Sequence, residues 1–165
     1  LHDALPISFC FYFGFMRTLN LPLFSFKYKD EAGKKLIFDE VRRKFVALTP
    51  EEWVRQNFLR YMEVHLGYPK GLTGVEKMLK IGGMAQRCDI VLYNRKGAAV
   101  LIVECKAPSV EIGEAALNQA ARYNTSLHVP YLVLTNGLKH FCIYTDTLTG
   151  YHVPMKGFPD FDALQ

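Results

Sequence analysis

The sequence predicts an α/β domain with a central mixed β-sheet flanked by helices. The 165 residues are 50% apolar or aromatic and 22% charged, which suits one globular domain with a sizeable core. Short apolar runs with strand periodicity lie before, between and after two longer stretches with helical periodicity. The run 99–103, Ala-Val-Leu-Ile-Val, is apolar at every position, as in a strand that is covered on both faces.

The first 17 residues are expected to lie outside this domain. Residues 4–16 are almost continuously apolar, but the run is shorter than the roughly 20 residues that a membrane-spanning helix needs. It also lacks the basic leader and small-residue cleavage site of a signal peptide. The opening Leu-His-Asp-Ala-Leu-Pro-Ile-Ser resembles the translation of a sequencing-adapter oligonucleotide. We therefore expect residues 1–17 to be a non-native or disordered extension, with a genuine hydrophobic extension as the alternative, and residues 18–165 to form a single domain.

The first elements are a hairpin and a helix. Alternation over 24–29, a turn at 30–34 and the apolar residues 36–38 predict a β-hairpin, and 41–46 forms another short extended piece. A helix over 50–66 follows. Thr49 suits its N-cap, Pro50 its first turn and Glu52 the capping-box position, and Gly67 opens the segment that ends it.

The second half alternates strands and a helix. Residues 71–81 fit either a strand or a short helix, and Gly82-Gly83 interrupts the pattern. The remaining expected elements are strands at 87–93, 99–106, 131–135 and 141–144, a helix at 113–127 and a turn at Asn136-Gly137.

Charge and cysteine content narrow the class of protein. A net charge of +4 permits a polyanionic partner without requiring one. The four cysteines form no CxxC pair, so a zinc site is not expected, and scattered free thiols favour a reducing compartment such as the cytoplasm.

Two acids and a lysine lie in the apolar region 87–106. Glu104 and Lys106 share a strand face because residues two apart point the same way. A two-residue loop at Lys96-Gly97 sets Asp89 directly opposite Glu104, and a loop at Arg95-Lys96 sets it one diagonal away. Only a three-residue loop without a bulge separates the two acids.

This arrangement suits phosphodiester hydrolysis. Mg²⁺ prefers hard oxygen ligands and is commonly held by one or two carboxylates, with water and phosphate completing its shell. A lysine beside it stabilises developing negative charge. The alternative is a surface hairpin in which Asp89 pairs with Arg87 or Lys106.

The same residues carry a family resemblance. Asp89, fourteen intervening residues and Glu104-Cys105-Lys106 resemble the Asp…(Asp/Glu)-x-Lys signature of the restriction-endonuclease-like nuclease superfamily. The segment from Gln119 to Tyr123 resembles the Gln-x-x-x-Tyr motif of its RecB-like branch. Several blocks, taken in order, are similar to the stand-alone form of the N-terminal nuclease domain of type I restriction enzyme R subunits. These blocks are residues 48–56, 67–69, 87–91, 103–108, 119–124 and 135–137.

The resemblance implies a restriction-endonuclease-like fold and a Mg²⁺-dependent DNA endonuclease, with Mn²⁺ as a substitute. Asp89, Glu104 and the backbone carbonyl of Cys105 would bind the metal, and Lys106 would assist the attacking water. Gln119 and Tyr123 would support the site or the DNA strand.

The first helix of related nucleases often adds another acid. Glu52 is the candidate here, with its capping role as the competing interpretation. Glu76 is a weaker candidate and is expected to be a plain surface carboxylate.

The implied partners are DNA, and restriction–modification subunits or a second copy of the chain, with no membrane. The 165 residues contain no Gly-x-x-x-x-Gly-Lys-(Ser/Thr) motif, so no ATP-driven motor is expected in them. The alternative function is a catalytically silent module of the same fold that binds nucleic acid or a restriction complex. Solvated basic surface is expected at Arg42, Arg43, Lys44 and Arg55, with phosphate contact as the rival interpretation, and Trp53 is expected in the core.

Overall fold

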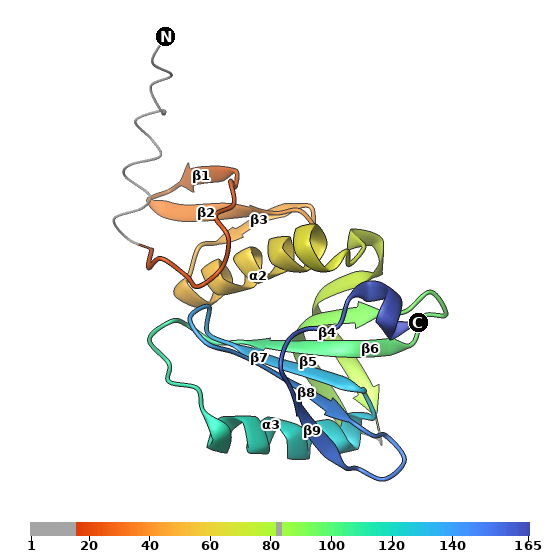
Figure 1. The fold of residues 1–165 in the computed structure, drawn as a ribbon. Helices are drawn as coiled ribbons and strands as arrows, with labels where there is room; N and C mark the ends of the chain where they lie inside the picture. Colours follow the sequence, from red (N-terminus) through yellow and green to blue (C-terminus); the bar gives the residue numbers. More distant parts are fainter. Residues whose placement is uncertain (1–15, 82–83) are drawn as a thin grey trace.

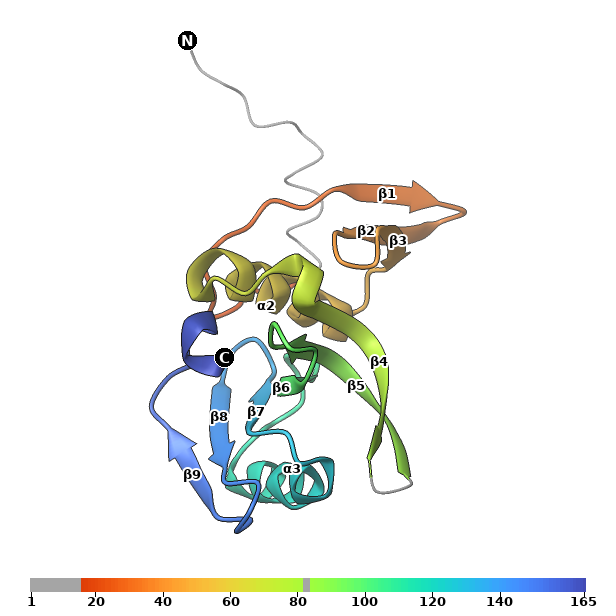
Figure 2. The same ribbon diagram turned by 90° about the vertical axis from the view of Figure 1, so that its right-hand side faces the viewer.

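The computed structural model describes residues 16–81 and 84–165, without the side chains of residues 81, 84 and 122–127. These described residues form two sheets and two α-helices (Figures 1 and 2). The first sheet is antiparallel and consists of β1 (Tyr28–Glu31), β2 (Lys34–Asp39) and β3 (Lys44–Ala47). The second has the order β4 (Thr73–Ile81), β5 (Met84–Tyr93), β6 (Ala99–Cys105), β7 (Tyr131–Thr135), β8 (His140–Thr145) and β9 (His152–Met155). The predicted mixed α/β architecture is confirmed, but the first strands form a separate sheet.

The two helices cover opposite faces of the six-stranded sheet (Figure 1). Helix α2 (Pro50–Leu66) packs Val54, Phe58 and Met62 against alternate residues of β5 and β6. Helix α3 (Glu114–Leu127) packs on the other face, against β7 and β8. Short 3₁₀ turns at Lys70–Leu72 and Phe161–Leu164 complete the fold. Among the described residues, no helix is long and apolar enough to cross a membrane.

Helix α2 has the predicted bounds because local signals fix both of its ends. The Thr49 hydroxyl accepts a hydrogen bond from the Glu52 backbone N–H at 3.1 Å, and Gly67 ends the helix with a φ of 70°. The predicted capping box forms only its first hydrogen bond, because the Glu52 carboxylate does not accept from the backbone N–H of Thr49. The backbone N–H of Thr49 donates to the carbonyl of Ala47, and the Glu52 carboxylate turns toward arginines instead.

The first hairpin is confirmed with shifted bounds. Its turn lies at Ala32 and Gly33, which both have positive φ, as a type I′ turn requires. The strand begins at Tyr28 rather than at residue 24, and Phe26 packs edge-on against the core residue Trp53. The ambiguous segment 71–81 is largely strand β4; the Gly82-Gly83 break lies outside the described residues.

The register of β5 and β6 is the one that brings the two acids together. Ile90 pairs with Val103, and the same register places Asp89 opposite Glu104. The predicted two-residue loop is wrong, since residues 94–98 connect the strands. A β-bulge between Leu92 and Tyr93 absorbs the difference and preserves the register.

Strands β6 and β7 are parallel, so the chain crosses between them through α3. The backbone N–H of Lys106 donates to the carbonyl of Thr135 at 2.8 Å, which fixes the end of β6 beside the end of β7. Strand β9 was not predicted. It is a short edge strand that contains Pro154, and proline weakens a sequence-based strand assignment.

Candidate functional site

Asp89 has both carboxylate oxygens engaged. Its Oδ2 accepts a hydrogen bond from the backbone N–H of Cys105 at 2.7 Å, which ties β5 to the end of β6. Its Oδ1 accepts from Nη2 of Arg55 at 2.8 Å. Asp89 therefore pairs with helix α2, and the expected alternative of a pair with Arg87 or Lys106 is wrong.

Glu104 and Lys106 form the second part of the site. Their side-chain Oε2 and Nζ atoms lie 3.7 Å apart at the end of the central strand β6. Burial and the neighbouring charge of Asp89 raise the pKa of Glu104, and Lys106 opposes that rise. Lys106 is 43% exposed, so its ammonium group is open to a substrate from solvent.

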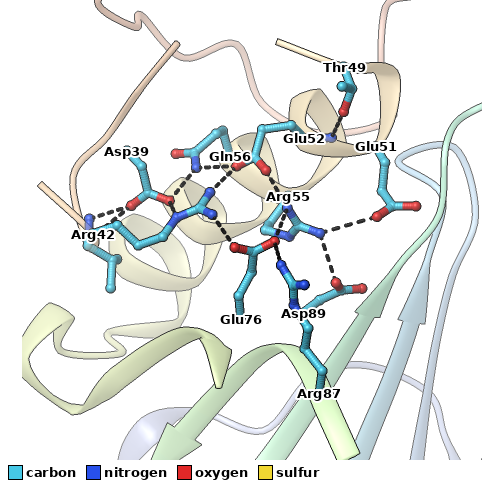
Figure 3. Close-up of polar contacts among 11 residues, drawn as sticks. Asp39, Arg42, Thr49, Glu51, Glu52, Arg55, Gln56, Glu76, Arg87 and Asp89 are labelled. Atoms are coloured by element: carbon cyan, nitrogen blue, oxygen red, sulfur yellow. Dashed lines mark hydrogen bonds and ion pairs between the residues drawn. The ribbon is translucent and has the colours of Figure 1, made fainter. Parts of the chain in front are cut away.

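Asp89 belongs to a larger charged network that joins both sheets through α2 (Figure 3). The network contains five carboxylates, three guanidinium groups and one amide. Its members are Asp39, Arg42, Glu51, Glu52, Arg55, Gln56, Glu76, Arg87 and Asp89.

Arg42 connects three segments of the chain. Its Nε lies 2.6 Å from Asp39 Oδ2, its Nη2 2.6 Å from Glu52 Oε1 and its Nη1 2.7 Å from Glu76 Oε2. The expectation of solvated basic surface is therefore wrong for Arg42, which is only 13% exposed. Glu76 is not a plain surface carboxylate either, since Arg42 and Arg87 both donate to it.

Arg55 links the network to the site and is also not surface. Its side chain is 6% exposed, with Nη1 bonded to Glu52 and Nη2 shared between Glu51 and Asp89. Burial alone would lower the pKa of Arg55, but the charges of Glu52 and Asp89 outweigh it and raise that pKa. Arg43 and Lys44 are exposed, as expected.

The neighbouring acids Glu51 and Glu52 of α2 differ in their burial and in their contacts. Glu52, the predicted acid of the first helix, is buried, and its oxygens accept from Arg42, Arg55 and Gln56. Arg55 therefore bridges Glu52 and Asp89 instead of leaving them in contact.

Glu51 shares a hydrogen-bond donor with the site residue Asp89. It is 45% exposed and shares Arg55 Nη2 with Asp89, and its charge contributes to the raised pKa of Glu104. The sequence analysis did not place Glu51 at the site, and it expected Arg55 to be basic surface rather than a partner of Asp89. The signal available was their spacing of four residues, which puts an acid and a base on one side of a helix.

The Gln-x-x-x-Tyr segment lies on α3. The Gln119 side chain is exposed, and among the described residues no hydrogen bond or ion pair links it to Asp89 or Glu104. The side chain of Tyr123 lies outside the described residues.

The donor set fits a magnesium ion in its chemistry. Asp89, Glu104 and the Cys105 carbonyl offer hard oxygen atoms, and Mg²⁺ is commonly held by one or two carboxylates with water in its other positions. No group of three Asp, Glu, His or Cys side chains within the described residues is arranged to hold a metal. Such a site would therefore depend on water or phosphate as further ligands. Burial and the charge of Asp89 raise the pKa of Glu104, and a cation bound beside it would oppose that rise.

Comparisons with known proteins agree with the motifs. The sequence profile of the family described as "Type I restriction enzyme R protein N terminus" matches residues 50–159. Among solved structures, the chain is similar to a fragment of a protein assigned as an HsdR subunit of a type I restriction enzyme from Vibrio vulnificus YJ016. The TM-score is 0.50 at 21% identity, over 71% of this chain and 24% of that chain, and this similarity concerns the fold alone. This chain thus spans about a quarter of that chain's length, and no curated protein matches it.

Proposed function

The chain belongs to the family of type I restriction enzyme R protein N-terminal domains, and from this premise we propose that it is a Mg²⁺-dependent DNA endonuclease of restriction-endonuclease-like fold. The observation that carries the proposal is the placement of Asp89 opposite Glu104, with Lys106 beside Glu104 at the end of a buried central strand. An exposed hairpin gives no reason for two facing carboxylates and a lysine at this position.

Each residue has a separate task in the proposed reaction. Asp89 and Glu104 would hold the metal, with the Cys105 carbonyl as a third oxygen. The Cys105 N–H and Arg55 keep the Asp89 carboxylate oriented. Lewis-acid chemistry and activation of the attacking water would come from Mg²⁺ when it is bound. Lys106 orients the attacking water and stabilises the negative charge that develops on the phosphate.

The direct test is cleavage by the purified protein of supercoiled, linear and single-stranded DNA with Mg²⁺ or Mn²⁺. We expect Asp89→Asn and Lys106→Ala to lower the cleavage rate by about 100-fold or more. Lys80→Ala is the control, because Lys80 is an exposed lysine at the far end of β4, paired with Ala85. Cleavage that survives both site variants would come from a contaminant and would reject the proposal.

The engagement of Asp89 by Arg55 favours a second candidate, a catalytically silent module that binds nucleic acid or a restriction complex. In that case Asp89 is a structural partner of Arg55. Such a module binds DNA without cutting it, and its Mn²⁺ binding does not depend on Asp89. Co-purification with restriction–modification subunits, or dimerisation, would identify a partner beyond DNA.

A further inference from the structure

We propose that Arg55 is the built-in counter-cation of the candidate site, and that its charge limits how tightly Asp89 and its neighbours hold a divalent cation. The inference rests on the proposed function, since it concerns the metal that the nuclease would use. It assigns to Arg55 a positioning role rather than a catalytic one.

The geometry places the Arg55 charge between two carboxylates. Its Nη2 lies 2.8 Å from Asp89 Oδ1 and 3.2 Å from Glu51 Oε1, so both acids converge on one nitrogen (Figure 3). The guanidinium is nearly buried, and charges interact more strongly where water is excluded. A divalent cation at Asp89 is therefore repelled by Arg55 and competes with it for the same carboxylate.

The guanidinium is also held in place from its other side. Nη1 bonds to Glu52, which in turn accepts from Arg42 and Gln56. The Nε atom is buried and has no hydrogen-bond partner among the described residues, so the two terminal nitrogens make all of the side chain's contacts with acids. The bond from Nη1 to Glu52 thus anchors Arg55 in the chain of ion pairs that reaches Arg42 and favours its position beside Asp89.

The charge balance explains why such a counter-cation is needed. Five carboxylates and three guanidinium groups leave the network with two negative charges. Arg42 and Arg87 contact Glu76, and within the described residues Arg55 alone among these arginines contacts Asp89. Arg55 thus stabilises the metal-free protein and weakens metal binding by the same interaction.

The test measures Mn²⁺ binding by electron paramagnetic resonance, which counts free Mn²⁺ and needs no cleavage. We expect Arg55→Gln to tighten Mn²⁺ binding by about tenfold or more, because it removes a positive charge next to Asp89. Arg87→Gln is the matched control, since it removes an arginine of the same network that touches Glu76 but makes no contact with Asp89. Its Mn²⁺ affinity should change by less than about threefold.

A second variant separates charge from contact geometry. Arg55→Lys keeps the positive charge and should bind Mn²⁺ within about threefold of the wild type. In the wild-type protein, saturation with Mg²⁺ should shift the side-chain NMR signal of Arg55 but not that of Arg87, with Arg55→Lys providing the assignment. These two measurements keep the proposal testable if Arg55→Gln does not fold.

The outcomes are distinct. If Mn²⁺ binding depends on Asp89 and Arg55→Gln leaves that binding unchanged or weakens it, this inference is wrong, while the proposed nuclease function is unaffected. An Arg55 signal that ignores Mg²⁺ also overturns it, as does a tenfold gain in affinity for Arg55→Lys. If neither the wild type nor Arg55→Gln binds Mn²⁺ through Asp89, this inference and the proposed nuclease function fail together.

Discussion

Glu76 occupies an unusual backbone position, with a φ of 52° in the middle of β4. Its neighbours Val75 and Lys77 pair with Ile90 and Cys88, so Glu76 lies level with Asp89 in the sequence of pairs but is not itself paired in the register. A positive φ is unfavourable for a residue with a side chain. The ion pairs of Glu76 with Arg42 and Arg87 compensate for this strain and hold the carboxylate beside the site.

The pKa of Glu76 gives a prediction for stability. Burial opposes its ionisation, but the hydrogen bond from Arg87 and the charges of Arg42 and Arg55 outweigh burial and lower the pKa. A lowered carboxyl pKa stabilises the fold above the unfolded value near 4.5, and this contribution is lost as the pH falls through the folded pKa.

We expect Glu76→Gln to reduce the free energy of unfolding at pH 7 by about 1–3 kcal/mol. Urea denaturation from pH 7 down to pH 3 measures the effect. The difference from the wild type should shrink as the pH falls below 4.5; a difference that stays constant with pH would contradict the ion-pair explanation.

At the scale of single residues, the sequence indicated the strand residues of the candidate site but not their ion pairs with α2. The two-residue period of strands put Glu104 and Lys106 on one face. The facing position of Asp89 was predicted from a loop length that is wrong, and the β-bulge between Leu92 and Tyr93 preserves the register. Arg55 meets Asp89 across 34 residues of sequence, and Arg42 meets Glu76 across the same separation. No periodicity encodes such ion pairs, because they depend on how α2 docks onto the sheet.

At the scale of helices and strands, the elements whose ends are marked by local capping residues were predictable from the sequence. Helix α2 begins after Thr49 and ends at Gly67, as expected, because hydrogen bonding at its start and a left-handed residue at its end are local properties. The β5–β6 loop was not predictable in detail. A bulge at Leu92 and Tyr93 changes the loop length without changing the register, and the sequence carries no clear sign of it.

The turn between β7 and β8 requires glycine at residue 137. Gly137 has a φ of 81°, and an added Cβ would lie 2.6 Å from Leu19 Cδ2 and 3.1 Å from Val54 Cγ2. Its carbonyl also accepts from the backbone N–H of Asn20 at 2.7 Å. This turn therefore joins the N-terminal segment and α2 to the sheet.

We expect Gly137→Ala to destabilise the protein by about 1–3 kcal/mol, from backbone strain and overpacking together. Thermal and urea unfolding measure the change. Gly157→Ala is the control, because an added Cβ there would meet no other described residue within 4 Å, apart from its chain neighbours, and the backbone has no positive φ. Equal effects of the two substitutions would show that close packing at Gly137 is not the cause.

Across the whole molecule, α2 connects parts of the chain that are distant in sequence. The Trp53 indole donates to the carbonyl of Arg17 at 3.2 Å, and Phe58 packs edge-on against Phe158. The Tyr68 hydroxyl, just beyond the helix, donates to the carbonyl of Pro159 at 2.5 Å. Local patterns did not predict the separate first sheet or these terminal contacts, since both arise from packing between distant segments.

The core extends past residue 159, where the family match ends. Phe161 and Leu164 are buried in the same cluster as Val54 and Phe58. We expect Phe161→Ala to lower the free energy of unfolding by about 3–5 kcal/mol, as for other buried phenylalanines. Leu148→Ala, at a side chain that is 95% exposed, should change it by less than about 0.5 kcal/mol. Denaturant unfolding that shows no difference between the two variants would place the C-terminal turn outside the core.

The parallel pairing of β6 and β7 has a consequence for when the site forms during synthesis. Cys105 pairs with Thr135, and Lys106 is fixed by the carbonyl of Thr135. Contacts this far apart in sequence close late, because the intervening chain must first be ordered. A ribosome-bound chain that has emerged only as far as α3 carries Asp89, Glu104 and Lys106 but lacks β7, whose Thr135 carbonyl fixes the backbone of Lys106. The backbone of Lys106 can therefore be held by Thr135 only after β7 has left the ribosome.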